Sequence, residues 1–289
     1  MLLGAHLSIG KGWLQVAATA AMLGCEAVQV FSRSPRGGPA RPLVREEVVR
    51  FRQEMLERGP LFVHTPYILN LAAEAEEKRY AAVRLLAEDW RRAAVLGAVA
   101  LVTHVGHAGG DRAAGLERVV QSLREAWEMS GEARQLPVLL LENTAGQGNE
   151  LGSTLQELGW LLRALRGGPA VGICLDTCHA FAAGYELRTE EGWDAFLSEV
   201  RRHVGLEAVR LIHLNDSRAG LGSRRDRHQE IGLGALGPAA FWYLLRRPEF
   251  SGLPAVIETP KKDVRDDARN LRRLRWLLTL PEPPRELTV

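Results

Sequence analysis

The residues most able to do chemistry stand together in the stretch 171–187, which reads VGICLDTCHAFAAGYEL. An apolar, strand-like run ends there in Asp176, and His179 follows three residues later at the start of an expected helical turn. Because residues three apart share one face of a helix, the carboxylate and the imidazole can point into the same space. That pairing favours metal binding. The alternative is that Asp176 only caps the following turn and His179 only packs.

Other strand-like runs end in the same kind of residue. Ionisable side chains close the third to the eighth runs, in the order His64, His104, Glu142, Asp176, His213 and Glu258. So many such groups at one edge of a parallel sheet would repel one another or be desolvated unless something neutralised them. Bound cations would do so, and we therefore expect a metal site.

Asp226 and His228 are separated by one residue, so in an extended segment both point to the same side. With His179 they could form a further coordination set. The alternative is that SRRDRHQE is simply a solvated charged loop.

The complete candidate ligand set is His64, His104, Glu142, Asp176, His179, His213, Asp226, His228 and Glu258. Imidazoles mixed with carboxylates suit Zn²⁺ or Mn²⁺ better than Ca²⁺ or an iron–sulfur cluster. Nine ligands exceed the need of one ion, so we predict a cluster in which a carboxylate such as Glu142 bridges two ions. Such clusters hydrolyse phosphate esters. We expect Cys174 and Cys178, which flank Asp176, to be small buried apolar residues instead.

The elements that would position these residues alternate between strands and helices. Strands are predicted over 2–7, 27–31, 61–64, 98–104, 138–142, 172–176, 208–214 and 255–258, and helices over 12–23, 43–58, 73–96, 111–130, 152–166, 190–203, 237–246 and 264–278. This alternation requires parallel strands with crossover helices. Eight units predict an α/β fold, a single-domain (β/α)₈ TIM barrel over residues 1–280, with a loosely ordered tail over 281–289. A doubly wound open sheet is the alternative, but SIGKGW after the first strand lacks the GxGxxG spacing.

The composition excludes several classes of protein. The 289 residues are 46% hydrophobic and 25% charged with a net charge of +2, as in ordinary globular proteins. No secretory signal or membrane-spanning run is visible, and three cysteines are too few for a disulfide framework. We therefore expect a cytoplasmic protein with no membrane partner.

Several motifs resemble the endonuclease IV family of apurinic/apyrimidinic endonucleases. They are GAHLS (4–8), HTPYILNL (64–71), LENTAGQG (141–148), GICLDTCHAFAAGY (172–185), HLNDS (213–217), GSRRDRHQEIGLG (222–234) and IETP (257–260). The resemblance implies a TIM barrel that holds three Zn²⁺ ions, with Mn²⁺ an alternative at one or more sites. It also implies hydrolysis of the phosphodiester 5′ to abasic sites in duplex DNA, leaving a 3′-hydroxyl, and removal of blocked 3′ ends.

The resemblance also assigns the ligands to individual ions. His64 and His104 would hold one ion, and Glu142 would bridge it to a second. Asp176, His213 and Glu258 would complete the ligands of the second ion, and the third ion would take His179, Asp226 and His228. In this scheme Glu142 or Glu258 is catalytic and orients the attacking hydroxide.

Family members insert side chains into the DNA duplex from loops after the second and third strands. The matching positions are Arg36 and Tyr67, and we assign His6 and Arg227 to substrate contacts as well. Without the resemblance, Tyr67 could be a core aromatic and Arg36 an ordinary surface residue. The partner would be duplex DNA, bound by a monomer associated with the nucleoid.

Two loops depart from the family pattern. THVGHAGG lacks the usual proline after the ligand histidine, so His107 could compete with His104. GGPARP follows Arg36 where relatives carry an aromatic residue, which would change how the duplex is penetrated.

Two other functions remain open. A sugar isomerase or epimerase of the same barrel type would use Glu142, Asp176, His213 and Glu258 around one or two ions. The Asp226 and His228 pair would have no function in such an enzyme. A DNA-damage binding module without turnover is the other alternative, although no bridging carboxylate has been lost.

Overall fold

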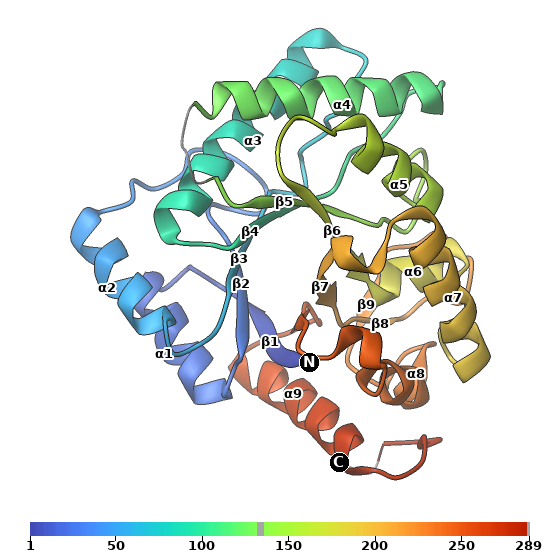
Figure 1. Ribbon diagram of the computed structural model, residues 1–289. Helices are drawn as coiled ribbons and strands as arrows, with labels where there is room; N and C mark the ends of the chain where they lie inside the picture. Colours follow the sequence, from blue (N-terminus) through green and yellow to red (C-terminus); the bar gives the residue numbers. More distant parts are fainter. Residues whose placement is uncertain (132–135, 288–289) are drawn as a thin grey trace.

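Eight parallel strands close into a barrel in the computed structural model, which describes residues 1–131 and 136–287 (Figure 1). Around the barrel the order is β1, β10, β7, β6, β5, β4, β3, β2. The strands are β1 (Leu2–Leu7), β2 (Ala27–Phe31), β3 (Leu61–His64), β4 (Ala100–Thr103), β5 (Val138–Glu142), β6 (Val171–Asp176), β7 (Val209–His213) and β10 (Pro254–Ile257). The predicted single-domain TIM barrel is confirmed.

Helices surround the strands on the outside of the barrel (Figure 1). They are α1 (Trp13–Leu23), α2 (Arg45–Met55), α3 (Glu76–Leu96), α4 (Arg112–Met129), α5 (Leu155–Ala164), α6 (Thr177–Ala183), α7 (Glu190–His203), α8 (Gly237–Leu245) and α9 (Val264–Thr279), with short 3₁₀ turns at Leu206–Ala208 and Pro248–Phe250. A two-stranded antiparallel hairpin, β8 (Asp216–Ser217) with β9 (His228–Gln229), projects after β7.

The first strand joins the last one to close the barrel. In register, Gly4 of β1 lies beside Ala27 of β2 and Val256 of β10. A Cβ atom at Gly4 would stand 1.7 Å from the carbonyl oxygen of Ala27, so only glycine permits this approach of the two strands. The closure places the first strand of the barrel, β1, beside the last one, β10.

The hydrophobic core has two parts. Inside the barrel, side chains from alternate positions fill the centre: Ala27, Phe62, Ala100, Val102, Leu140, Cys174, Leu211 and Val256. A larger cluster lies between the strands and the ring of helices, where Leu101 and Val83, for example, are fully buried. All three cysteines are buried and unpaired, which confirms the burial predicted for Cys174 and Cys178.

The structure differs from the expected elements in the loops that carry the site. Helix α6 confirms the helical turn expected at His179 and extends it to seven residues, whereas the β8–β9 hairpin was not predicted, because two-residue strands are too short to show a periodicity. The carboxylate of Asp176 does cap α6, since its Oδ1 accepts a hydrogen bond from the backbone N of His179 at 2.8 Å. Asp176 can therefore cap α6 and still belong to the candidate metal site.

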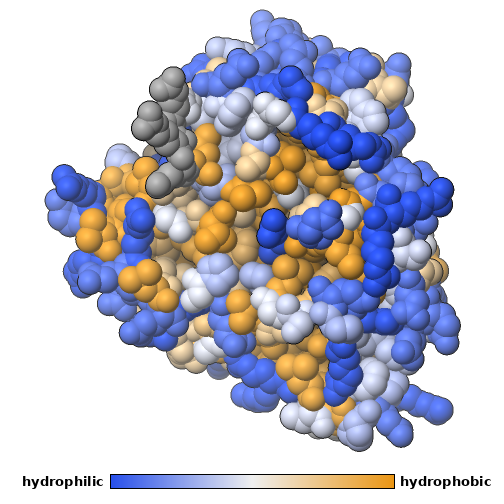
Figure 2. Space-filling model, in the orientation of Figure 1, coloured by the Kyte–Doolittle hydropathy of each residue, from blue (hydrophilic) through white to orange (hydrophobic). Residues whose placement is uncertain are grey.

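On the face seen in Figure 1, hydrophobic side chains gather over the middle and hydrophilic ones over the rim (Figure 2). In the two described ranges, we find no helix with both the length and the apolar character to cross a membrane. The loosely ordered tail over 281–289 stays a prediction: α9 ends at Thr279, and residues 288–289 lie outside the described part.

Candidate metal centre

The six strand-end residues named in the sequence meet at one end of the barrel. His64, Glu142, Asp176 and His213 are the last residues of β3, β5, β6 and β7. His104 and Glu258 stand one residue beyond β4 and β10, which are shorter or shifted by one relative to the expected strands. Because all eight strands are parallel, these side chains share the face on which active sites of this architecture are built.

The first group joins β3, β4 and β5. Oε2 of Glu142 lies 3.0 Å from Nε2 of His64 and 3.1 Å from Nε2 of His104. The other ring nitrogen of His64 donates a hydrogen bond to the carbonyl of Thr65 at 2.7 Å. Since a carbonyl only accepts, Nδ1 carries the proton and Nε2 keeps its lone pair for a cation.

The second group shares Glu142 with the first. Its members are Glu142, Asp176, His213 and Glu258, whose ligand atoms lie within 4.8 Å of one another. Nδ1 of His213 is 3.1 Å from Oε1 of Glu142 and 3.2 Å from Oε2 of Glu258. Nε2 of His213 donates to Oε1 of Gln29 at 2.9 Å, so Nδ1 is the ring nitrogen that would face a metal ion.

The third group combines α6 with the hairpin. Oδ1 of Asp226 lies 3.3 Å from Nε2 of both His179 and His228. Both Nε2 atoms are buried and have no hydrogen-bond partner in the described structure, whereas the Nδ1 atoms donate to the carbonyls of Asn143 and Glu258. Orphaned, buried nitrogens facing a carboxylate are what a metal site requires.

Cys178 offers a fourth grouping with Asp176 and His228. Burial raises the pKa of its thiol to about 12, which keeps the sulfur protonated. A neutral thiol is a poor ligand, so the imidazole of His179 is the better donor at this position.

Electrostatics favours cations throughout the cluster. Burial alone would raise the pKa of Glu142, but the imidazoles of His104 and His213 hold that pKa well below its usual range. Burial alone would lower the pKa of His179, but Asp176 and Asp226 raise it well above its usual value. The carboxylates are therefore balanced by protons on the imidazoles, and metal ions would displace those protons.

Several polar residues that support the cluster were missed in the sequence. Gln29, fully buried in β2, donates to Oε1 of Glu258 at 2.7 Å. Asn215 donates to Oδ2 of Asp176 at 2.6 Å and accepts from the backbone N of Glu258 at 2.8 Å. The signal for Gln29 was a polar residue inside the apolar strand AVQVF, and for Asn215 its place directly after a strand end.

His107 lies outside every metal-binding group in the described residues. It is exposed and pairs with Glu150 as a β-bridge. Its backbone N donates to Oδ1 of Asn70 at 2.9 Å. The structure therefore brings His104, and not His107, to the cluster.

The residues expected to contact DNA lie at or near the mouth. Tyr67 is 61% exposed, and its ring centroid is 5.3 Å from that of Phe31. Its backbone N donates to the carbonyl of Pro35 at 3.1 Å, which ties its loop to the loop carrying Arg36. Ile68, which the sequence did not single out, is equally exposed beside it.

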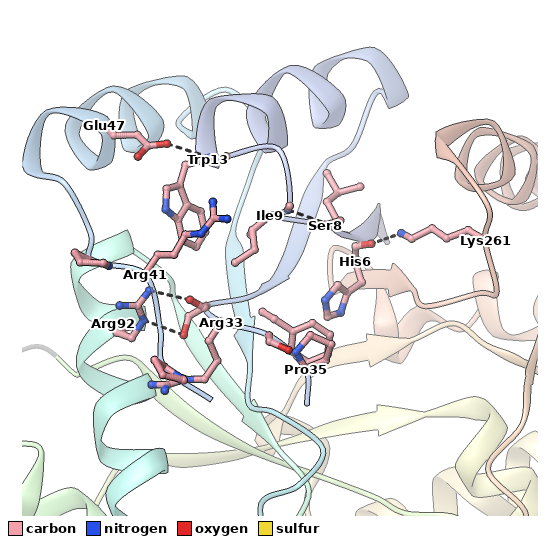
Figure 3. A pocket seen from close by; sticks show the side chains of 18 residues that line it. His6, Ser8, Ile9, Trp13, Arg33, Pro35, Arg41, Glu47, Arg92 and Lys261 are labelled. Carbon is pink, nitrogen blue, oxygen red and sulfur yellow. Dashed lines mark hydrogen bonds between the residues drawn. The ribbon is translucent and has the colours of Figure 1, made fainter. Parts of the chain in front are cut away.

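His6 is buried at the edge of the cluster and also forms one wall of a pocket of about 590 Å³ (Figure 3). In this view its ring points toward the cavity between Pro35 and Ile9, and Lys261 bonds to its carbonyl oxygen. Arg33, Arg41 and Arg92 line the opposite wall. Arg227 is exposed in the loop that leads into β9.

Comparisons with known proteins agree with this geometry. A family model described as the xylose isomerase-like TIM barrel matches residues 17–279. A probable endonuclease 4 of Methanoculleus marisnigri is 41% identical over 280 residues, covering 96% of this chain and 99% of the relative. The crystal structure of endonuclease IV from Thermus thermophilus is 38% identical, with a TM-score of 0.85 over 96% of this chain and 99% of that one.

A D-tagatose 3-epimerase-like protein also superimposes, with a TM-score of 0.71 at 20% identity over 96% of this chain and 97% of that one. At this identity the likeness concerns the fold alone.

Proposed function

The chain belongs to the endonuclease 4 family of xylose isomerase-like TIM barrels, and from this premise we propose that it is a DNA-repair endonuclease that cuts at abasic sites. The cut would fall on the 5′ side of the abasic sugar and leave a 3′-hydroxyl. Removal of blocked 3′ ends would use the same site. Action on chromosomal DNA would place the protein in the cytoplasm with the nucleoid.

The observation that carries this proposal is the third metal-binding group beside the other two. His179, Asp226 and His228 adjoin the first two groups, which share Glu142. A sugar isomerase or epimerase needs one or two ions, so this alternative function would explain the second group alone. We propose three Zn²⁺ ions, with Mn²⁺ as the alternative at one or more sites, held by the nine residues named above.

Bound metal ions would activate water and stabilise the charge on the attacking and leaving oxygens of a phosphodiester. The chain's own part is to hold the ligands in place and to keep other water out. Glu142 is fully buried between two groups, and its two oxygens face different histidines. Glu258, held by His6 and Gln29, has one oxygen turned toward His213, from which it can orient the attacking nucleophile.

Access to the lesion would depend on the exposed residues at the mouth. An abasic sugar must leave the duplex to reach the buried cluster. Tyr67 and Ile68 are large apolar side chains that are exposed where a folded protein would otherwise bury them. We propose that Tyr67 replaces the lost base stacking and that Arg36 contacts the strand from the adjoining loop.

The test is incision of a duplex that carries one tetrahydrofuran abasic analogue by the purified, zinc-loaded protein. We expect a nick on the 5′ side of the analogue, and a rate that declines with time in a chelator. Metal analysis should give close to three zinc per chain. Sugar isomerisation without nicking, with one or two exchangeable ions, would instead establish the isomerase. Tight binding of the lesion without any turnover would establish a damage-binding module.

A further inference from the structure

Helix α9 carries a buried amide that bonds to two segments of the metal centre. Asn270 lies on α9 and is fully buried. Its Oδ1 accepts a hydrogen bond from the backbone N of Ile231 at 2.8 Å, and its Nδ2 donates to Oγ1 of Thr259 at 3.1 Å. Ile231 follows His228 by three residues, and Thr259 follows Glu258 directly. One side chain therefore joins the segment after a ligand of the third group to the segment after a ligand of the second.

The amide of Asn270 uses all of its hydrogen-bonding capacity. Besides the two contacts above, Nδ2 donates to the carbonyl of Asp266 at 3.0 Å, and Oδ1 accepts from Nη1 of Arg273 at 3.2 Å. An asparagine amide offers two hydrogens and two lone pairs, and each of them has a partner here. The backbone N of Ile231 can only donate and the carbonyl of Asp266 can only accept, so the amide has one orientation. A side chain held in this way keeps its partners at fixed distances.

A second side chain of α9 holds the same segment after the hairpin. Arg273, which is 7% exposed, donates from Nη1 to Oε2 of Glu230 at 2.7 Å. Because residues three apart share one face of a helix, Asn270 and Arg273 meet residues 230 and 231 from the same side. A capping box in the first turn of α9 fixes where the helix begins, and with it the register of this face.

The hairpin that carries two ligands of the third group needs such an anchor. Its strands, β8 and β9, have two residues each, and so short a hairpin is not stable by itself. The side chains of Asp226 and His228 are 38% and 18% exposed, whereas that of His179 is only 3% exposed. His179 is held by α6 and the core. The geometry of the third group therefore depends on where the hairpin lies.

His228 and Glu258 also contact each other directly. Nδ1 of His228 donates to the backbone carbonyl of Glu258 at 3.1 Å. Within the two described ranges, β9 pairs with β8 alone, and no backbone ladder joins it to β10. The spacing between the two segments is therefore set by side chains, and Asn270 bonds to both of them.

We propose that Asn270 is a positioning residue, which holds His228 of the third metal-binding group at a fixed distance from Glu258 of the second. The inference rests on the proposed function, because the ions of both groups are proposed there. Without this amide the hairpin would gain freedom to move relative to β10. Residues that orient metal ligands typically contribute about 10–100-fold to metal affinity or activity. The first group, carried by β3, β4 and β5, should be unaffected.

The test is a zinc titration of the metal-free protein in competition with a fluorescent chelator, without DNA. The wild-type protein should bind three ions. In Asn270→Ala we expect one of the three to bind about tenfold more weakly, while the other two keep the wild-type affinity. Thr259→Val keeps the shape of its side chain and removes only one of the two contacts, so it should weaken the same ion about threefold. This milder variant also decides the matter if Asn270→Ala is too unstable to titrate.

A combined variant shows through which ligand Asn270 acts. His228→Gln removes a ligand of the third group and should itself weaken one ion. Addition of Asn270→Ala should then weaken zinc binding no further, because two changes that act through one contact are not additive. A further tenfold loss in the combined variant would show that Asn270 does not act through His228, and would contradict the proposal.

Trp90→Phe is the matched control for a purely structural effect. Nε1 of Trp90, a buried residue of α3, donates to the carbonyl of Pro137 at 2.8 Å, so this variant also loses one buried hydrogen bond from an outer helix. Both Trp90→Phe and Asn270→Ala should lower the unfolding temperature of the metal-free protein, but only Asn270→Ala should weaken a zinc ion. In nicking assays Asn270→Ala should lower kcat about tenfold and leave KM for lesion-containing DNA unchanged.

Three results would overturn the role of Asn270. They are wild-type affinity for all three ions in both Asn270→Ala and Thr259→Val, equal weakening of all three ions, and the same loss of zinc in Trp90→Phe. Each would show that Asn270 only stabilises the fold. Wild-type nicking and zinc content are measured separately. A wild-type protein that nicks and holds three ions, with one of these results, refutes this inference alone, whereas absence of nicking refutes the proposed function.

Discussion

Nδ1 of His6 lies 3.0 Å from Oε1 of Glu258, although 252 residues separate the two in sequence. Closure of the barrel between β1 and β10 brings them together. Because a carboxylate only accepts hydrogen bonds, Nδ1 is the donor in its contact with Glu258, and the amide nitrogen of Gln29, 2.9 Å from the same Nδ1, donates to that carboxylate as well. Nε2 of His6 has no hydrogen-bond partner among the described residues. Burial lowers the pKa of His6 to about 4, so the ring is neutral when the protein is active. His6 is therefore a positioning residue for Glu258.

Replacement of His6 by Ala should leave Oε1 of Glu258 held by Gln29 alone. Partners of metal ligands typically contribute about 10–100-fold to metal affinity or activity, and we expect a loss of that size in kcat. His6→Asn, whose amide can also donate to the carboxylate, should recover part of it. Zinc content and kcat measured together check this prediction. Equal losses in His6→Ala and His6→Asn would contradict the proposed hydrogen bond.

Glu258→Gln removes the charge but keeps the shape of the side chain. We expect DNA binding to be retained and kcat to fall by about 10²–10³, because one preorganised charge at the reacting centre is lost. Single-turnover nicking with saturating enzyme separates the chemical step from binding. An unaltered rate would remove Glu258 from the mechanism. Glu249→Gln, far from the mouth beside Arg201, is the control and should be neutral.

The strand-end residues could be predicted because parallel strands bring their carboxyl ends to a common mouth, so position along the chain implies position in space. His64 and His213 illustrate this, since each closes an apolar run. Gln29 could not be predicted in the same way, because its role depends on the strand register that places it beside Glu258.

Tyr67→Ala should weaken binding to lesion-containing duplex by about 1–3 kcal/mol, since the exposed ring is proposed to replace base stacking. Tyr80→Ala is the matched control: Tyr80 is also an exposed tyrosine, but it lies on α3. Fluorescence of a 2-aminopurine opposite the lesion reports how far the duplex is disturbed. Equal behaviour of the two variants would show that Tyr67 does not enter the stack.

The metal-free protein should have a stability maximum in mildly acidic solution. Folding raises the pKa of His179 and His213. Their contribution to the free energy of unfolding is therefore fully present below the ordinary histidine pKa of about 6.5, and it is lost as the pH rises through the raised values. Folding lowers the pKa of Glu142 and Glu258. Their contribution to the free energy of unfolding is therefore present above the ordinary glutamate pKa of about 4.3, and it is lost as the pH falls through the lowered values. Urea unfolding of the chelator-treated protein between about pH 4 and 9 measures this. Zinc should remove the loss at high pH, because it replaces the imidazole protons.

The loop carrying Arg36 depends on a buried ion pair. Nε of Arg33 lies 2.8 Å from Oδ1 of Asp89, and Nη1 of Arg33 donates to the carbonyl of Gly38 at 3.1 Å. Burial raises the pKa of the Asp89 carboxyl despite hydrogen bonds from Ser32 and Arg33, so its charge relies on these donors.

Arg33→Met should therefore lower the free energy of unfolding by about 3–5 kcal/mol, because it leaves a buried carboxylate without its cation. It should also raise KM for lesion-containing DNA, since the loop loses its anchor at Gly38. The double variant Arg33→Met/Asp89→Leu, which removes both charges, should regain most of the stability but not the low KM. Urea unfolding and nicking kinetics on the two variants measure the two effects separately. A double variant that regains both would show that the pair serves stability alone.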